Sequence, residues 1–308
     1  MTNMLPDLWI IASLAAAGFQ TLRFVMQKVL ATATLTPTGA TFARFLYSAP
    51  IIFVAITTYI YSSGVSLPEI GFDFWVFAAA GGLAQVIATV CVVSLFKSRN
   101  FAVGVTLMKT EVILSVVVGL VLLGDGVSWV AFGAISLGLI GVLLLSTPPE
   151  VSGWGWRAMW NRSVLLGLSS GVLFAVSAVC YRGASLEIMS SDPVIRAGVT
   201  LSAVTGMQMI GMALWLRLRD AGQIASVWRA HSTAIWVGLL SLAGSFCWFF
   251  AFTLQNAAYV KAVGQVELIF SLIASMVIFS ERSSARELSG MLVLTASILL
   301  LILVIPTT

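Results

Sequence analysis

Lys109 and Glu111 stand in the segment LMKTEVILS, inside a stretch that is otherwise almost wholly apolar from Phe101 to Leu123. If this stretch crosses a membrane, each charge costs about 2.5–3.5 kcal/mol on insertion scales and usually faces the protein interior or a wet cavity. There the ammonium group of Lys109 could bind the carboxylate of a substrate. Glu111 could carry a proton, or it could join a neighbouring helix by a hydrogen bond, because burial disfavours its charged form.

A second segment, VGQVELIFS, repeats this polar pattern: Glu267 matches Glu111, Gln265 matches Lys109, and Lys261 precedes Gln265 by one turn. In a continuous helix, two residues turn the chain by about 200°. We therefore expect two separate polar surfaces. The glutamates share a stripe with small residues, which favours close helix packing, whereas the lysines and Gln265 face a cavity. Lys261, one turn into its helix, could instead extend its ammonium group to the membrane surface.

Three uncharged side chains near mid-span could orient a bound solute. Gln20 and Gln85 suit hydrogen bonding to a zwitterion, although buried glutamines also join helices, and Trp248 could stack on an aromatic group. Arg23 and Arg44 are expected to pair with helix-end carbonyls or with a glutamate. The predicted substrate-binding residues are Gln20, Gln85, Lys109, Glu111, Trp248, Lys261, Gln265 and Glu267.

These residues lie in apolar segments that are about as long as membrane-spanning helices. The chain of 308 residues is 59% hydrophobic and 9% charged, whereas soluble domains carry about 25% charged residues. Blocks of about 20 residues cross a hydrocarbon core as helices and are too long for barrel strands. We predict an all-α integral membrane protein with ten spans, at 8–30, 36–62, 71–96, 100–123, 127–147, 163–186, 192–217, 232–255, 257–280 and 284–306.

The two halves of the chain align without a gap at a constant offset of 156 residues. The matched pairs include Pro37 and Pro193, Asn100 and Asn256, Glu111 and Glu267, and Ser115 and Ser271. Each half has five spans, an odd number, so the second half must enter the membrane from the opposite side. Such inverted repeats around a midplane site are typical of secondary transporters. We predict a first repeat at 1–147, a linker at 148–162 and a second repeat at 163–308.

The positive residues predict the orientation. With the amino terminus outside, ten lysines and arginines fall in cytoplasmic connections and only Arg182 falls on the other face. This bias favours both termini on the periplasmic side of a bacterial inner membrane. The net charge of +4 is then a consequence of topology and predicts no nucleic-acid partner.

No motif predicts enzymatic chemistry, a metal or a cofactor. The segment GVTLMKT ends like a phosphate-binding loop, but it lacks the glycine before the lysine and follows no strand. The three cysteines have no metal or redox spacing. The single histidine, His231, is expected at a loop, and no aspartate lies mid-span, so an intramembrane protease is not supported.

A further set of residues carries a family resemblance. The first half has Lys28, then Pro37, then Arg44 followed by phenylalanine, and Asp125 and Glu281 close the fourth and ninth spans. Glycines seven apart in the fifth and tenth spans of the family correspond here to Ala134 and Gly141, and to Gly290 and Ser297.

In this order and spacing, the chain resembles the drug/metabolite transporter superfamily in its ten-helix EamA-type form, and within it the YddG-type amino-acid exporters. The resemblance implies a basket of ten helices around a cavity lined by spans 1, 3, 4, 6, 8 and 9. It also implies efflux of aromatic or other neutral amino acids. One departure is that Glu111 and Glu267 stand where many members have proline, fourteen residues before the helix-end acid.

The leading prediction is therefore an exporter of amino acids and similar small amphipathic solutes that works by alternating access. A proton-coupled drug or cation exporter is the alternative, with Glu111 or Glu267 as the proton carrier, and an organic-phosphate exchanger is a third. A non-transporting membrane scaffold is the alternative from another class. The expected partners are a small-molecule substrate and lipid. Coupling, substrate preference and the choice between monomer and homodimer stay open.

Overall fold

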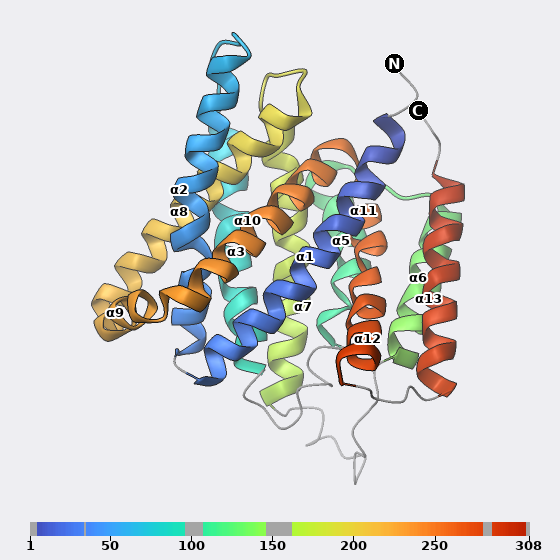
Figure 1. The fold of residues 1–308 in the computed structure, drawn as a ribbon. Helices are drawn as coiled ribbons and strands as arrows, with labels where there is room; N and C mark the ends of the chain where they lie inside the picture. The colour runs from blue at the N-terminus through green and yellow to red at the C-terminus, as the bar shows by residue number, and fades with distance from the viewer. Residues whose placement is uncertain (1–4, 34, 96–106, 146–161, 280–284, 306–308) are drawn as a thin grey trace.

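A computed structural model describes residues 5–33, 35–95, 107–145, 162–279 and 285–305, and in these ranges the regular structure is entirely α-helical (Figure 1). The helices are α1 (Leu5–Ala33), α2 (Pro37–Ser62), α3 (Phe72–Leu95), α5 (Glu111–Leu123), α6 (Trp129–Leu145), α7 (Arg162–Leu186), α8 (Pro193–Arg219), α9 (Ala221–Arg229), α10 (His231–Leu254), α11 (Ala257–Gly264), α12 (Val266–Phe279) and α13 (Ala285–Val304).

Seven of the described helices are long and apolar enough to cross a membrane: α1, α2, α3, α7, α8, α10 and α13. Their outward faces carry large apolar side chains, such as Phe53, Leu83 and Leu303, which are well exposed on the isolated chain. Contiguous apolar surface of this extent is unusual for a soluble monomer and suits contact with lipid. The chain is therefore a multi-pass membrane protein with an all-α fold.

The matched prolines of the two halves occupy the same position in their helices. Pro37 and Pro193 are the first residues of α2 and α8, where a missing N–H group is harmless. The preceding side chains cap the helices, since Thr36 Oγ1 accepts from Gly39 N at 3.1 Å and Asp192 Oδ1 accepts from Val194 N at 2.8 Å.

The helices pack in pairs that join distant parts of the sequence. The pairs with extensive contact include α3 with α7, α1 with α10, α2 with α8, and α6 with α13, and Figure 1 shows α6 and α13 side by side. In this last pair a Cβ on Gly141 or Gly290 would lie 2.7 Å from a backbone nitrogen of the other helix. Ser297 Oγ donates to Ala134 O at 2.7 Å. The four positions of the spaced-glycine motif therefore form a helix interface.

The prediction of continuous helices at 100–123 and 257–280 is wrong. Residues 109–110 form a turn immediately before α5, and residues 100–106 lie outside the described part of the chain. In the second half, α11 ends at Gly264 and α12 begins at Val266, with Gln265 between them. Lys109 and Gln265 are matched positions of the repeat, so the regular α-helix is interrupted at the same place in both segments.

The short helix α9 is a second difference, because residues 218–231 are expected to form a loop. Its Val227 is fully buried while its opposite side is exposed, as expected of an amphipathic helix. It packs against the connection between α1 and α2, where Gln223 Oε1 accepts from Thr36 N at 3.0 Å. The prediction that His231 lies at a loop is close, since it is the exposed first residue of α10.

Candidate functional site

A cavity lies among α1, α2, α3, α7 and α10, with one side chain contributed by α11. Its empty volume, including its opening to solvent, is about 500 Å³. Three cations, two amides, three serines and five aromatic residues account for most of its lining: Arg23, Arg44, Lys261, Gln20, Gln85, Ser177, Ser241, Ser245, Phe174, Tyr181, Trp248, Phe249 and Phe252. Among the described residues that line it there is no acidic side chain.

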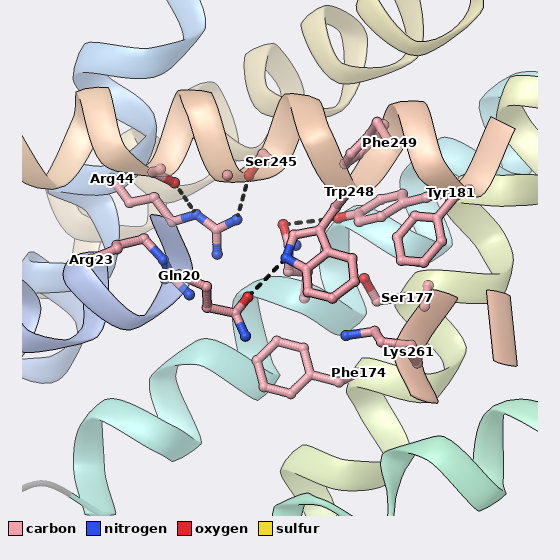
Figure 2. A pocket seen from close by; sticks show the side chains of 15 residues that line it. Gln20, Arg23, Arg44, Phe174, Ser177, Tyr181, Ser245, Trp248, Phe249 and Lys261 are labelled. Atoms are coloured by element: carbon pink, nitrogen blue, oxygen red, sulfur yellow. Dashed lines mark hydrogen bonds between the residues drawn. The ribbon is translucent and has the colours of Figure 1, made fainter. Parts of the chain in front are cut away.

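Arg44, on α2, reaches the cavity while its side chain is held by hydroxyl groups. Its Nε donates to Ser241 Oγ at 2.6 Å and its Nη2 donates to Ser245 Oγ at 2.9 Å (Figure 2). A long contact of 3.5 Å joins Nη1 to Thr89 Oγ1. These partners are all uncharged, so they orient the guanidinium group without neutralising it.

Arg23, on α1, is similarly buried. Its Nη1 donates to Gln27 Oε1 at 3.1 Å, and Gln27 in turn donates to Ala40 O at 3.2 Å. The guanidinium carbon lies 4.3 Å from the ring centroid of Phe24. The expectation that Arg23 and Arg44 pair with helix-end carbonyls or a glutamate is wrong for the described residues. Their partners there are amide and hydroxyl groups and aromatic rings.

Aromatic side chains form the opposite part of the cavity, and Figure 2 shows Arg23 and Arg44 on one side of Trp248 with Tyr181 on the other. The Trp248 ring stacks on Phe252 with a centroid distance of 5.8 Å. A Cβ on Gly264 would overlap the Trp248 ring, so the glycine at the end of α11 makes room for the indole. This wall suits the apolar part of a ligand.

Gln20 links the cavity to the buried charges behind it. Its Oε1 accepts from Trp248 Nε1 at 3.1 Å, and its Nε2 donates to Glu267 Oε2 at 2.7 Å. The same carboxylate oxygen accepts from Lys109 Nζ at 3.0 Å. Trp248, Gln20, Glu267 and Lys109 therefore form one chain of hydrogen bonds from the aromatic wall into the protein.

A second ion pair joins the two halves in the reverse direction, and we call the two together the crossed ion pairs. Lys261 Nζ lies 3.3 Å from Glu111 Oε2, and it also lies 4.9 Å from the Trp248 ring centroid, within the range of a cation–π interaction. Lys261 therefore has a buried carboxylate partner and does not extend to the membrane surface. Each lysine binds the glutamate of the other half of the chain.

The interruptions of the α-helix at Lys109 and Gln265 explain how the buried glutamates are stabilised. Glu111 and Glu267 lie in the first turns of α5 and α12, where unpaired N–H groups favour a negative charge. Lys261 lies in the last turn of α11, where a positive charge is favoured. The prediction of two separate polar surfaces is wrong, because positions within one helix do not show which residues of another helix face them.

Gln85 and Gln265 have mainly structural partners. Gln85 Oε1 accepts from Tyr181 Oη and from Gln208 Nε2, both at 3.0 Å, and so joins α3, α7 and α8 while lining the cavity. Gln265 Nε2 donates to Lys109 O at 3.4 Å, and its buried Oε1 has no hydrogen-bond partner among the described residues. This hydrogen bond connects the two helix interruptions.

A polar cluster joins α5, α7 and α10 next to the aromatic wall. Arg182 pairs with Asp125, the acid that follows α5, and its Nη1 donates to Phe252 O at 2.9 Å. Asn256, whose side chain caps α11, donates to Asp125 O at 3.4 Å. The acid predicted from the family pattern thus connects three helices, and its counterpart Glu281 lies outside the described residues.

Four predicted site residues line the cavity: Gln20, Gln85, Trp248 and Lys261. The other four, Lys109, Glu111, Gln265 and Glu267, are buried beside it in the crossed network. Sequence reasoning missed the cavity positions of Tyr181, Phe174 and the serines. Serines and aromatics are frequent throughout the apolar blocks, so their types alone do not distinguish them.

No protein-family profile and no curated protein sequence matches this chain. Matching solved structures comprise 29 chains. One of them, described only as "Crystal structure of protein", has a TM-score of 0.70 at 16% sequence identity, and the match covers 99% of this chain and 100% of that one. The chain therefore shares the overall fold of a solved structure over its whole length.

Proposed function

We propose that this chain is a secondary transporter of the drug/metabolite transporter type that exports amino acids and similar small amphipathic metabolites across a bacterial inner membrane. The observation that carries the proposal is the cavity, in which Arg23 and Arg44 lie at one end and aromatic rings form a wall at the other (Figure 2). A solute with a polar end and an apolar side chain matches this division. Aromatic and other neutral amino acids are such solutes.

The packing supports an inverted repeat of ten spans. The contacts of α3 with α7 and of α1 with α10 are equivalent under the 156-residue offset, and the pairs α2 with α8 and α6 with α13 each join matched helices. With α5, α6 and the broken helix α11–α12, the seven long helices would make the ten crossings of this proposal. The first described residue of α1 and the last of α13 lie at the same end in Figure 1, as an even number requires.

The broken helices support alternating access around this cavity. Secondary transporters with inverted repeats commonly interrupt two spans near the membrane midplane, next to the substrate. Here the interruptions at Lys109 and Gln265 carry ion pairs that join the two halves. The Arg182–Asp125 cluster joins further helices beside Phe252, which lines the cavity. Rearrangement of these contacts would open the cavity to one side at a time, and the charge bias favours both termini outside.

The cavity lining disfavours the alternative of a cation exporter. Among the described lining residues there is no acid to neutralise a cationic drug, and the three cationic side chains of the lining would repel it. Glu267 reaches the cavity only through Gln20, and it already accepts from Lys109. Proton coupling through this glutamate stays a separate alternative, which the flux measurement tests.

The deciding measurement is flux of each of the twenty amino acids into or out of proteoliposomes that contain only the purified protein, with and without a pH gradient. We expect saturable flux of aromatic or other neutral amino acids. A folded protein without flux for any amino acid would contradict the proposal and favour a scaffold. Flux that depends on the pH gradient and is altered by Glu267→Gln or Glu111→Gln would establish proton coupling.

A further inference from the structure

Arg23 and Arg44 are 4% and 5% exposed, yet neither has a carboxylate within 4 Å among the described residues. Burying a charge without an opposite charge is strongly unfavourable, and a buried cation in a membrane protein ordinarily marks a ligand pathway. Both side chains line the cavity. Two guanidinium groups without an ion-pair partner among the described residues therefore face the space where a solute would bind.

The donor groups of the two arginines are only partly used. A guanidinium group carries five N–H donors. Arg44 directs three nitrogens to hydroxyl oxygens, whereas Arg23 donates one side-chain hydrogen bond among the described residues, to Gln27. Glu267 exerts an electrostatic attraction on Arg23 from beyond ion-pair distance. That carboxylate is already shared by Lys109 and Gln20.

The third cation of the lining differs, because Lys261 has Glu111 as its partner. Among the described residues, the arginine end of the cavity therefore has no carboxylate partner, whereas Lys261 has one. A planar guanidinium fork matches the two oxygens of a carboxylate. Since the neighbouring wall is aromatic, the fitting ligand is a monoanion that carries an aromatic or bulky apolar group.

Among the described residues that line the cavity, no carboxylate is present to pair with an ammonium group. The oxygen of Gln20 accepts from Trp248, and the oxygen of Gln85 accepts from Tyr181 and Gln208. Nearby positive charges would also repel an ammonium group. The amino group of an amino acid would thus contribute little to binding.

We infer that Arg23 and Arg44 form an anion-binding subsite, and that the protein recognises its solutes as small aromatic or apolar monocarboxylates, for which an amino group is not required. This inference rests on the proposed function, because it names the substrate class of the same cavity. It extends the range from amino acids to carboxylates that lack the amine.

The test is a binding series on the purified full-length protein, followed by the shift in melting temperature and by calorimetry. The ligands are 3-phenylpropionate, which lacks the amine, L-phenylalanine, phenethylamine, which lacks the carboxylate, and inorganic phosphate. We expect 3-phenylpropionate to bind at least as tightly as L-phenylalanine, and phenethylamine not to bind. Equal binding of phenethylamine, or tighter binding of phosphate than of 3-phenylpropionate, would overturn the inference.

Variants locate the subsite. Arg44→Gln should weaken 3-phenylpropionate binding by about 100-fold and Arg23→Gln by about tenfold, because each loses charge-assisted hydrogen bonds to the anion. Arg44→Lys should recover part of the affinity, since it keeps the charge but not the fork. Arg219→Gln, at an exposed residue near the end of α8, is the matched control and should bind as the unaltered protein does. Unchanged affinity in both cavity variants would overturn the assignment.

The wild-type ligand series remains decisive if a variant does not fold. The inference and the proposed function also fail in different ways. Flux of L-phenylalanine without binding of 3-phenylpropionate would remove the inference and leave the transporter. Binding of 3-phenylpropionate with no flux of any solute would leave the anion subsite and remove the transporter.

Discussion

Four cationic side chains are buried in the described part of the chain, and they form two pairs with opposite surroundings. Lys109 and Lys261 lie near the helix interruptions, and each contacts a glutamate of the other half. Arg23 and Arg44 stand at the far end of the cavity among hydroxyl, amide and aromatic groups. The lysines therefore have ion-pair partners within the protein, whereas the arginines have none among the residues that the structure describes.

The contrast separates a structural use of charge from a binding use. A buried ion pair holds two elements in a defined relation, and it is costly to break from one side because the remaining charge stays buried. A buried cation without a counter-ion is available to an anion that enters from solution. Removing a lysine should mainly affect stability, and removing an arginine should mainly affect binding.

The largest effect is expected from breaking one crossed pair. Lys109→Met leaves Glu267 buried with Gln20 as its one remaining hydrogen-bond partner among the described residues, and should lower the free energy of unfolding by about 3–5 kcal/mol. The double variant Lys109→Met/Glu267→Leu should recover most of this loss, because no unpaired charge remains. Unfolding in a denaturing detergent measures all four members of the cycle. A double variant as unstable as the single one would show that the pair does not act as a unit.

The opposite result is expected for the arginines: removing one should reduce ligand affinity much more than stability. Arg44→Gln should leave the melting temperature of the ligand-free protein nearly unchanged or raised, because an uncompensated buried charge is removed. Its affinity for 3-phenylpropionate should nevertheless fall by about 100-fold. Melting curves with and without the ligand give both values. A large loss of stability without ligand would show that Arg44 is structural, like the lysines.

Much of the helical arrangement could be predicted from the sequence. Long apolar blocks require helices in lipid, and Pro37 and Pro193 indicate the first residues of α2 and α8. The constant offset between the halves also identified Lys109, Glu111, Gln265 and Glu267 as matched polar positions. All four lie in one network in the structure.

The pairing within that network could not be predicted, because it depends on contacts between helices. The break at Gln265 follows Gly264 in an apolar run without proline, and Gln265 Nε2 donates to Lys109 O across the interface. For the same reason, the sequence does not show that Arg44 faces serines of α10 and no carboxylate. A residue type predicts the cost of burial, whereas the neighbouring helix determines how that cost is met.

A smaller effect is expected at the aromatic wall. Gly264→Ala introduces a methyl group where the Trp248 ring lies, so the ring must move. Overpacking of this kind costs about 1–3 kcal/mol, and we expect about a tenfold loss of affinity for 3-phenylpropionate. Calorimetry measures this loss. The control Gly206→Ala, with no atom within 4 Å of its added Cβ, should retain full affinity. Unchanged affinity in Gly264→Ala would exclude the indole wall from ligand binding.

The smallest effect is expected at Gln20, the side chain that connects the two regions. Gln20→Ala removes one hydrogen bond to Trp248 and one to Glu267, while Lys109 continues to neutralise the glutamate. One lost hydrogen bond at the wall contributes about 1 kcal/mol, so the affinity for 3-phenylpropionate should fall by about fivefold. Calorimetry on Gln20→Ala and on the control Gln223→Ala, whose side chain supports α9, separates a local from a general effect. If both variants lose affinity equally, Gln20 acts through overall stability, and the cavity and the crossed ion pairs are not linked through it.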